Sequence, residues 1–218
     1  MEQKQIRPGL WQLTARDEGL RVFRAASFTE TGMMYQSYLM DAGGIFIALG
    51  TLPARYGAEW LETIRTIVGD NGIGWAVLLG TEDDRAAARL LMGAYSEAVF
   101  IGGNKTLFQL EGFTEQELQS IEARTNRSLT LGNKRLELRV LADKLGARLY
   151  VLDRAEGVLV TADAFGSVYG GAEPWSVSWR TRPAGYGGRR GISPISRAQN
   201  AGGASPSLRR WCGRTGWA

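Results

Sequence analysis

The order of the hydrophobic segments constrains the fold of this chain more than any other feature. Strand-like segments come first, a helix–strand–helix passage follows at residues 58–96, and strand-like segments return after it. Within that passage, residues 75–79 form a continuous apolar run, which is typical of a strand covered on both faces. We therefore expect helices covering a mixed sheet, and not a doubly wound parallel fold, in which strands and helices would alternate to the end.

Single elements are predicted from hydrophobic period and from turn signals. Residues 58–68 carry apolar side chains at helical spacing and are followed by Gly69. Residues 41–43 lie between two strand-like segments and indicate a hairpin. Thr114 and Glu117 form a capping box, which predicts a helix reaching about Ala123. The other expected elements are strands at 9–13, 20–23, 34–40, 44–49, 98–101, 135–142, 148–152 and 158–161, and a helix at 84–96.

The chain contains no histidine, and its only cysteine is Cys212. These two facts exclude a Ser-His-Asp or Cys-His nucleophile, an imidazole-ligated metal and a cysteine-only metal site within one chain. Any chemistry must therefore use carboxylates, hydroxyls, amines and backbone groups. No secretory leader or membrane-spanning segment is visible, and one cysteine allows no internal disulfide, so we expect a cytoplasmic protein.

The net charge of +4 is unevenly distributed. Residues 172–218 contain eight arginines, no lysine and one acidic residue, which gives this stretch +7 and the rest of the chain −3. The same stretch holds four of the seven tryptophans and is rich in Gly, Ser, Pro and Ala. This change of composition divides the chain into a domain at residues 1–171 and a tail at residues 172–218.

Three interpretations of the tail remain open. A basic segment with tryptophans suits a nucleic-acid arm, in which arginines contact phosphates and aromatic rings stack on bases. A genuine but disordered tail is the second interpretation. The third is a frameshift in a GC-rich gene, because arginine without lysine in a Gly/Ala/Ser/Pro/Trp mixture is typical of such a reading. We favour the third, and nucleic acid is the least favoured partner.

An acidic stretch follows the buried strand and precedes a helix, a place where functional groups collect in α/β sheets. It contains Glu82, Asp83 and Asp84. Carboxylate oxygens in this number could bind a hard cation. The simpler interpretation is that Thr81 or Asp83 caps the helix and that the acids favour the positive end of its dipole.

A second stretch, Val158 to Gly166, ends an apolar strand with Thr-Ala-Asp-Ala-Phe-Gly. With it, the chain resembles the metallo-β-lactamase-like domain of the flavodiiron proteins (A-type flavoproteins), from about Ile6 to Gly170. Residues 34–39 look like the family's "TYNSYL" strand, and residues 47–51 stand where the family has "ALIDT". The resemblance implies an αββα sandwich (α+β class), incomplete at its C-terminal end. It also implies a family activity, the reduction of oxygen or nitric oxide at a di-iron centre. This centre receives electrons from FMN in an attached flavodoxin-like domain.

The resemblance also locates the family's metal-ligand positions in this chain. The motif His-x-Glu-x-Asp-His falls on residues 80–85, so Glu82 and Asp84 are retained, whereas the two histidines are replaced. The third histidine position, in the family's "HWPDS" segment, is also replaced, and the bridging aspartate is retained. The six vestigial positions are Gly80, Glu82, Asp84, Arg85, Lys144 and Asp163.

These replacements predict a site without metal. Three neighbouring carboxylates cannot all stay ionised without positive charge nearby, and Arg85 and Lys144 could supply it in place of metal ions. The alternatives are that both cations reach solvent, or that the carboxylates alone bind Mg²⁺ or Mn²⁺, which two cations would oppose.

Two functions follow from the resemblance. In the first, the chain is a non-catalytic, metal-free domain that pairs in a homo- or heterodimer. In the second, it belongs to a flavin-dependent oxidoreductase whose flavodoxin-like domain, or a similar redox partner, is not part of this chain. In both cases we expect no cofactor bound by the chain itself and no membrane association.

Overall fold

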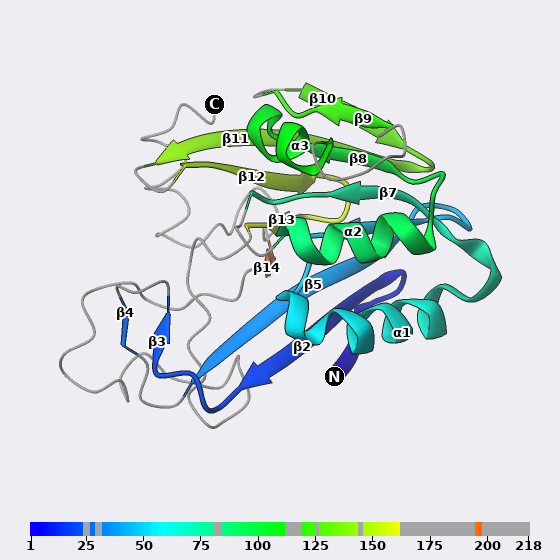
Figure 1. Ribbon diagram of the computed structural model, residues 1–218. Coiled ribbons are helices and arrows are strands. Elements are labelled where there is room, and N and C mark those ends of the chain that lie inside the picture. Colours follow the sequence, from blue (N-terminus) through cyan, green and yellow to red (C-terminus); the bar gives the residue numbers. More distant parts are fainter. Residues whose placement is uncertain are drawn as a thin grey trace.

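Two β-sheets pack face to face, and three helices cover the outer face of the larger sheet (Figure 1). The computed structural model describes residues 1–23, 27–28, 32–80, 84–111, 119–124, 127–143, 146–161 and 195–197. Within these ranges, only the backbone is described for residues 22–23, 27–28, 84–86, 111, 141–143, 146–147 and 195–197. The described part therefore has three layers, helices, sheet and sheet.

The larger sheet has seven strands in the order β1-β2-β5-β6-β7-β8-β9. Neighbours from β1 to β6 pair antiparallel, and neighbours from β6 to β9 pair parallel. Strands β3 (Val22–Phe23) and β4 (Ser27–Phe28) form a separate hairpin. The seven strands are β1 (Glu2–Arg7), β2 (Leu10–Asp17), β5 (Met33–Asp41), β6 (Phe46–Leu49), β7 (Ile73–Val77), β8 (Val99–Gly102) and β9 (Ser120–Glu122).

The smaller sheet has five strands, and all its neighbours pair antiparallel. Four of them follow one another along the chain, so short turns are enough to connect them. The strands are β10 (Arg127–Leu131), β11 (Lys134–Asp143), β12 (Gly146–Asp153), β13 (Val158–Val160) and β14 (Ile195–Arg197).

The longest helix shows why the helices lie on the larger sheet. In α1 (Gly57–Val68), Trp60, Ile64 and Val68 recur at intervals of four and are all buried, which gives the helix one apolar face. Within the described residues, no helix is long and apolar enough to cross a membrane. The remaining helices are η1 (Ala54–Tyr56), η2 (Gly69–Asn71), α2 (Asp84–Ala94) and α3 (Asn104–Glu111).

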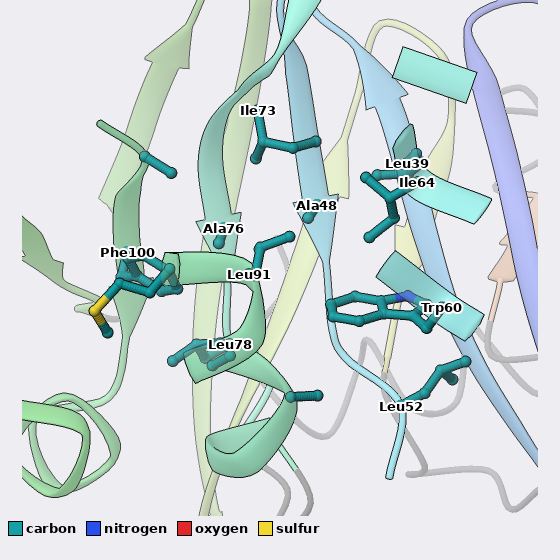
Figure 2. Packing of buried hydrophobic residues seen from close by; sticks show 14 of the residues in the cluster. Leu39, Ala48, Leu52, Trp60, Ile64, Ile73, Ala76, Leu78, Leu91 and Phe100 are labelled. Atoms are coloured by element: carbon teal, nitrogen blue, oxygen red, sulfur yellow. The ribbon is translucent and has the colours of Figure 1, made fainter. Parts of the chain in front are cut away.

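Side chains along the parallel strands point alternately to the two faces of the larger sheet, so these strands lie between two apolar cores. Ala48, Ala76 and Phe100 are paired across β6, β7 and β8 and face the helices (Figure 2). The next residues along the strands, Leu49, Val77 and Ile101, face the smaller sheet. The continuous apolar run predicted for the central strand is thus confirmed, because the strand is buried on both faces.

The core on the helix side contains one specific polar contact. The indole N–H of Trp60 donates a hydrogen bond of 2.8 Å to the hydroxyl of Ser37 on β5, and both residues are buried. Figure 2 shows the ring of Trp60, a residue of α1, beside Leu52. Burial of the large ring therefore leaves no unpaired indole donor.

Backbone hydrogen bonds join the two sheets at opposite ends of the sandwich. Next to the hairpin between β5 and β6, Asn133 N–H donates to Ala42 C=O at 2.9 Å. At the other end, beyond the carboxyl end of β7, Leu149 N–H donates to Leu79 C=O at 3.1 Å. Only a close approach of the chain backbones allows these bonds, so they fix how the sheets sit on one another.

Most of the elements predicted from hydrophobic pattern are confirmed, with small shifts of their ends. The helix predicted to reach Ala123 is wrong at its end, since residues 120–122 form β9 and pair with β8. The capping-box residues Thr114 and Glu117 lie outside the described residues. Sequence analysis also missed α3, β1 and β10, whose mixed polar composition gives no clear period.

At the β5–β6 hairpin, the backbones of the two sheets lie so close that a side chain at Gly132 should lower the stability by steric clash. A second glycine with positive φ allows this clash to be separated from backbone strain. Gly132 and Gly44 both have positive φ, +57° and +90°, but an added Cβ at Gly132 would lie 2.1 Å from Ala42 C=O, whereas nothing lies within 4 Å at Gly44. We expect Gly44→Ala to lower the free energy of unfolding by about 1 kcal/mol. Gly132→Ala should cost about 1–3 kcal/mol more, because the backbone must move. Urea denaturation followed by circular dichroism measures both, and equal losses would contradict the contact.

Candidate functional site

The candidate site is expected at the carboxyl ends of the parallel strands. Beyond the last residues of β6 and β7, the chain keeps its hydrogen bonds to the neighbouring strand. Gly50 N–H donates to Val77 C=O at 2.8 Å, and Leu78 N–H donates to Ile101 C=O at 2.7 Å. These bonds hold the segment before the acidic stretch rigidly in place. The carboxyl edge of such a sheet is where ligands bind in many α/β proteins.

The smaller sheet reaches the same edge through β12. Leu149 N–H donates to Leu79 C=O, so β12 lies against the residue that precedes Gly80. Both leucines are buried between the sheets. The start of β12, from Gly146, therefore runs toward the backbone of Leu79.

Strand β13 brings a third segment to this edge. Val160 pairs with Val151 of β12, two residues from Leu149, and the next residue, Thr161, is 1% exposed. The described part of the chain after β13 thus ends beside β12, at Thr161, which lies two residues before position 163 in the sequence. The described elements gather the backbone leading to all three predicted segments at one end of the sandwich.

Gly80 itself has a backbone conformation that favours glycine. Its φ is +85°, in the left-handed region that residues with a Cβ rarely adopt. A histidine at this position, as in the family's motif, would be strained on this backbone. The glycine predicted to stand in place of a family histidine thus has a backbone that favours glycine, which no sequence pattern revealed.

The structure describes only part of the other five predicted site residues. Asp84 and Arg85 begin α2, and only their backbone is described. Glu82, Lys144 and Asp163 lie outside the described residues. Among the side chains that are described, no group of three or more metal-ligating residues lies together. The predicted cluster therefore stays a prediction.

Sequence analysis missed one charged residue at this end of the sandwich. Arg148 on β12 is only 6% exposed, although arginine is almost never fully buried unless it is paired. It directly precedes Leu149, which is bonded to Leu79. Arg148 stands in a predicted strand segment, and its alternation with inward-facing Leu149 and Val151 would have assigned it to the outer face of the sheet. Its burial could not be inferred from that pattern.

A separate ion-pair group lies farther along the outer face of the smaller sheet. Arg154 Nε contacts Glu137 at 2.5 Å, and Arg139 lies 3.8 Å from the same carboxylate. The hydrogen bond from Arg154 lowers the pKa of the Glu137 carboxyl, which burial opposes and the charge of Arg139 reinforces. These partners are partly exposed, so the group contributes little to stability. It provides a useful contrast to the buried Arg148.

Comparison with known proteins defines the class of fold. No protein-family profile matches the sequence. The fold is similar to those of a flavodiiron protein from Giardia intestinalis (TM-score 0.66, 20% identity), the rubredoxin oxygen:oxidoreductase of Desulfovibrio gigas (0.66, 20%) and a flavo di-iron protein from Thermotoga maritima (0.67, 19%). These similarities cover 76–78% of this chain and 42% of each of those chains. The chain thus has the metallo-β-lactamase-like fold of these proteins, as expected.

Sequence similarity agrees with the fold. The flavo-diiron protein FprA2 of Clostridium acetobutylicum is 28% identical over 131 residues, which is 59% of this chain and 32% of that protein. Sequence and fold are thus both similar to those of flavodiiron proteins, as the resemblance predicted. The matched part is about a third of the length of this curated relative.

The junction between the sheets predicts strong protection of one amide. Leu149 N–H is bonded to Leu79 C=O inside the apolar layer, so it should exchange with solvent only when the sheets separate. We expect its exchange, measured by NMR, to be at least roughly a hundredfold slower than that of Glu156 N–H, which donates to Asp153 in a turn. Similar rates for both amides would show that this end of the sandwich is not closed.

Proposed function

We propose that this chain is a metal-free, non-catalytic metallo-β-lactamase-like domain of a flavodiiron-type protein. In this proposal, Arg85 and Lys144 form ion pairs with Glu82, Asp84 and Asp163 where relatives carry their metal ions. The observation that carries the proposal is the set of residues at the family's metal-ligand positions. Every position where the family has histidine holds a residue that does not bind iron, and the chain contains no histidine at all.

The residues present do not fit a di-iron centre. Iron bound by imidazole and carboxylate needs neutral or negative ligands, whereas Arg85 and Lys144 are cations that repel metal ions. The positive φ of Gly80 adds a second mismatch, because the backbone there disfavours any residue with a side chain. We therefore derive no reaction step through iron.

A domain that catalyses no reaction can still function by associating with another subunit. We propose that the chain associates with a second copy or with a related, catalytically competent subunit. The redox activity named for relatives such as the oxygen:oxidoreductase of Desulfovibrio gigas would then belong to the partner. The alternative, a flavin-dependent subunit, is favoured by no observation on the described residues.

Metal analysis tests the proposal. The whole chain is produced in medium supplemented with iron and zinc, purified without chelators, and analysed by mass spectrometry of the elements. We expect far less than one metal ion per chain, because cations occupy the ligand positions. The flavo-diiron protein of Clostridium acetobutylicum, prepared in parallel, is the control for metal supply.

Stoichiometric iron or zinc in the purified chain would contradict the proposal. Stoichiometric manganese or magnesium, with the other metals absent, would instead support the carboxylate-only site. A flavin absorption spectrum in the purified chain would support the flavin-dependent alternative.

A further inference from the structure

Three arginines surround one carboxylate on the outer face of the smaller sheet. Leu136 and Leu138 of β11 are buried between the two sheets, so the residues that alternate with them along the strand point to the outer face. The first residue after β12 contacts the same carboxylate. The group, which we call the Glu137 cluster, consists of Arg135, Glu137, Arg139 and Arg154.

Contacts within the cluster hold its arginines around Glu137. Arg154 Nε donates a hydrogen bond of 2.5 Å to one oxygen of Glu137, and the guanidinium of Arg139 lies 3.8 Å from the other. Arg135 Nε donates at 3.1 Å to the hydroxyl of Ser128, which is opposite Glu137 in the strand register. The hydrogen bond from Arg154 lowers the pKa of the Glu137 carboxyl, burial opposes this, and the charges of all three arginines reinforce it.

The cluster carries more positive charge than its own carboxylate balances. Three guanidinium groups and one carboxylate sum to +2. The side chain of Arg154 is 62% exposed, and Arg135 is exposed as well. A guanidinium has five N–H donors, and the contacts described for these two arginines use one donor each. Both side chains therefore have donors left for a ligand that approaches from solvent.

The charge of the cluster selects an anionic partner from another molecule. Residues 172–218 carry +7, so electrostatic repulsion opposes a complex between this part of the chain and the cluster. Nucleic acid fits less well than separate carboxylates, because Glu137 at the centre repels a continuous phosphate backbone. Tyr150, the one aromatic residue in the described part of the smaller sheet, is 6% exposed and offers no ring on which a base could stack.

We propose that the Glu137 cluster is a docking surface for an acidic segment, rich in Asp and Glu, of a partner protein. Carboxylates of the segment bind Arg135 and Arg154, because the planar guanidinium matches a carboxylate through two parallel hydrogen bonds. Glu137 orients the arginines over the sheet and competes with the incoming carboxylates. This inference goes beyond the proposed function and does not depend on whether the candidate site binds metal.

Titration with a hexaglutamate peptide tests the docking surface. The whole chain is isotope-labelled, and NMR follows the Nε–Hε signals of Arg135, Arg139 and Arg154. These signals give a local dissociation constant, which is separate from binding of the peptide to the basic tail. We expect them to shift on titration, whereas the signal of Arg65, an exposed arginine that pairs with Glu62 on α1, should stay in place.

Two substitutions distinguish a docking surface from a solvated ion-pair group. Arg135→Gln removes an exposed cation and should weaken local binding about threefold to fivefold, the effect of one charge at contact distance in water. Glu137→Gln removes the competing carboxylate and should strengthen local binding by about the same factor. Arg65→Gln makes the same charge change as Arg135→Gln on the helix side of the molecule, so it is the matched control and should leave the constant unchanged.

The outcomes that would overturn the proposal are specific. Unchanged local binding in Arg135→Gln would overturn it, and so would unchanged or weaker binding in Glu137→Gln. Tighter binding of a single-stranded oligonucleotide than of the peptide at the same signals would overturn it in favour of nucleic acid. A dimer of the chain alone that Arg135→Gln dissociates, measured by analytical ultracentrifugation, would make a second copy the occupant and would also overturn it. If Glu137→Gln is insoluble, the response of Arg135→Gln decides.

Discussion

The apolar layer between the two sheets is the interaction on which the rest of this structure depends. Side chains such as Leu49, Val77 and Ile101 fill it from the larger sheet, and alternating residues of β11, β12 and β13 fill it from the smaller one. Burial of this layer supplies the main driving force for packing the sheets, while the backbone bonds at its two ends fix their relative position. The second of these bonds, between Leu149 and Leu79, holds β12 beside the residues that follow β7, where the candidate site is expected.

Much of the fold could be predicted from the sequence, because its strongest signals are periodic. The run at residues 75–79 identified a strand covered on both faces, and the spacing of Trp60, Ile64 and Val68 identified the longest helix. Weak signals failed. The capping box at Thr114 led to a helix predicted as far as Ala123, where pairing with β8 instead selects a strand. A short strand is decided by a neighbour distant in the sequence, which local propensity does not contain.

The residues of the candidate site stay a prediction, whereas the structure adds features of the chain around them. The resemblance assigns six positions, and the absence of histidine predicts a changed ligand set at them. The left-handed conformation of Gly80 and the burial of Arg148 appeared only in the structure. Both depend on how segments far apart in the sequence are held together.

The central claim is that side-chain cations take the place of metal ions at this site. A crystal structure of the chain grown with excess zinc, with anomalous diffraction recorded at the zinc edge, tests it most directly. The account predicts nitrogen atoms of Arg85 and Lys144 within about 4 Å of the carboxylates of Glu82, Asp84 and Asp163, and no anomalous peak among them. An anomalous peak coordinated by those three carboxylates, with the cations turned toward solvent, would contradict it.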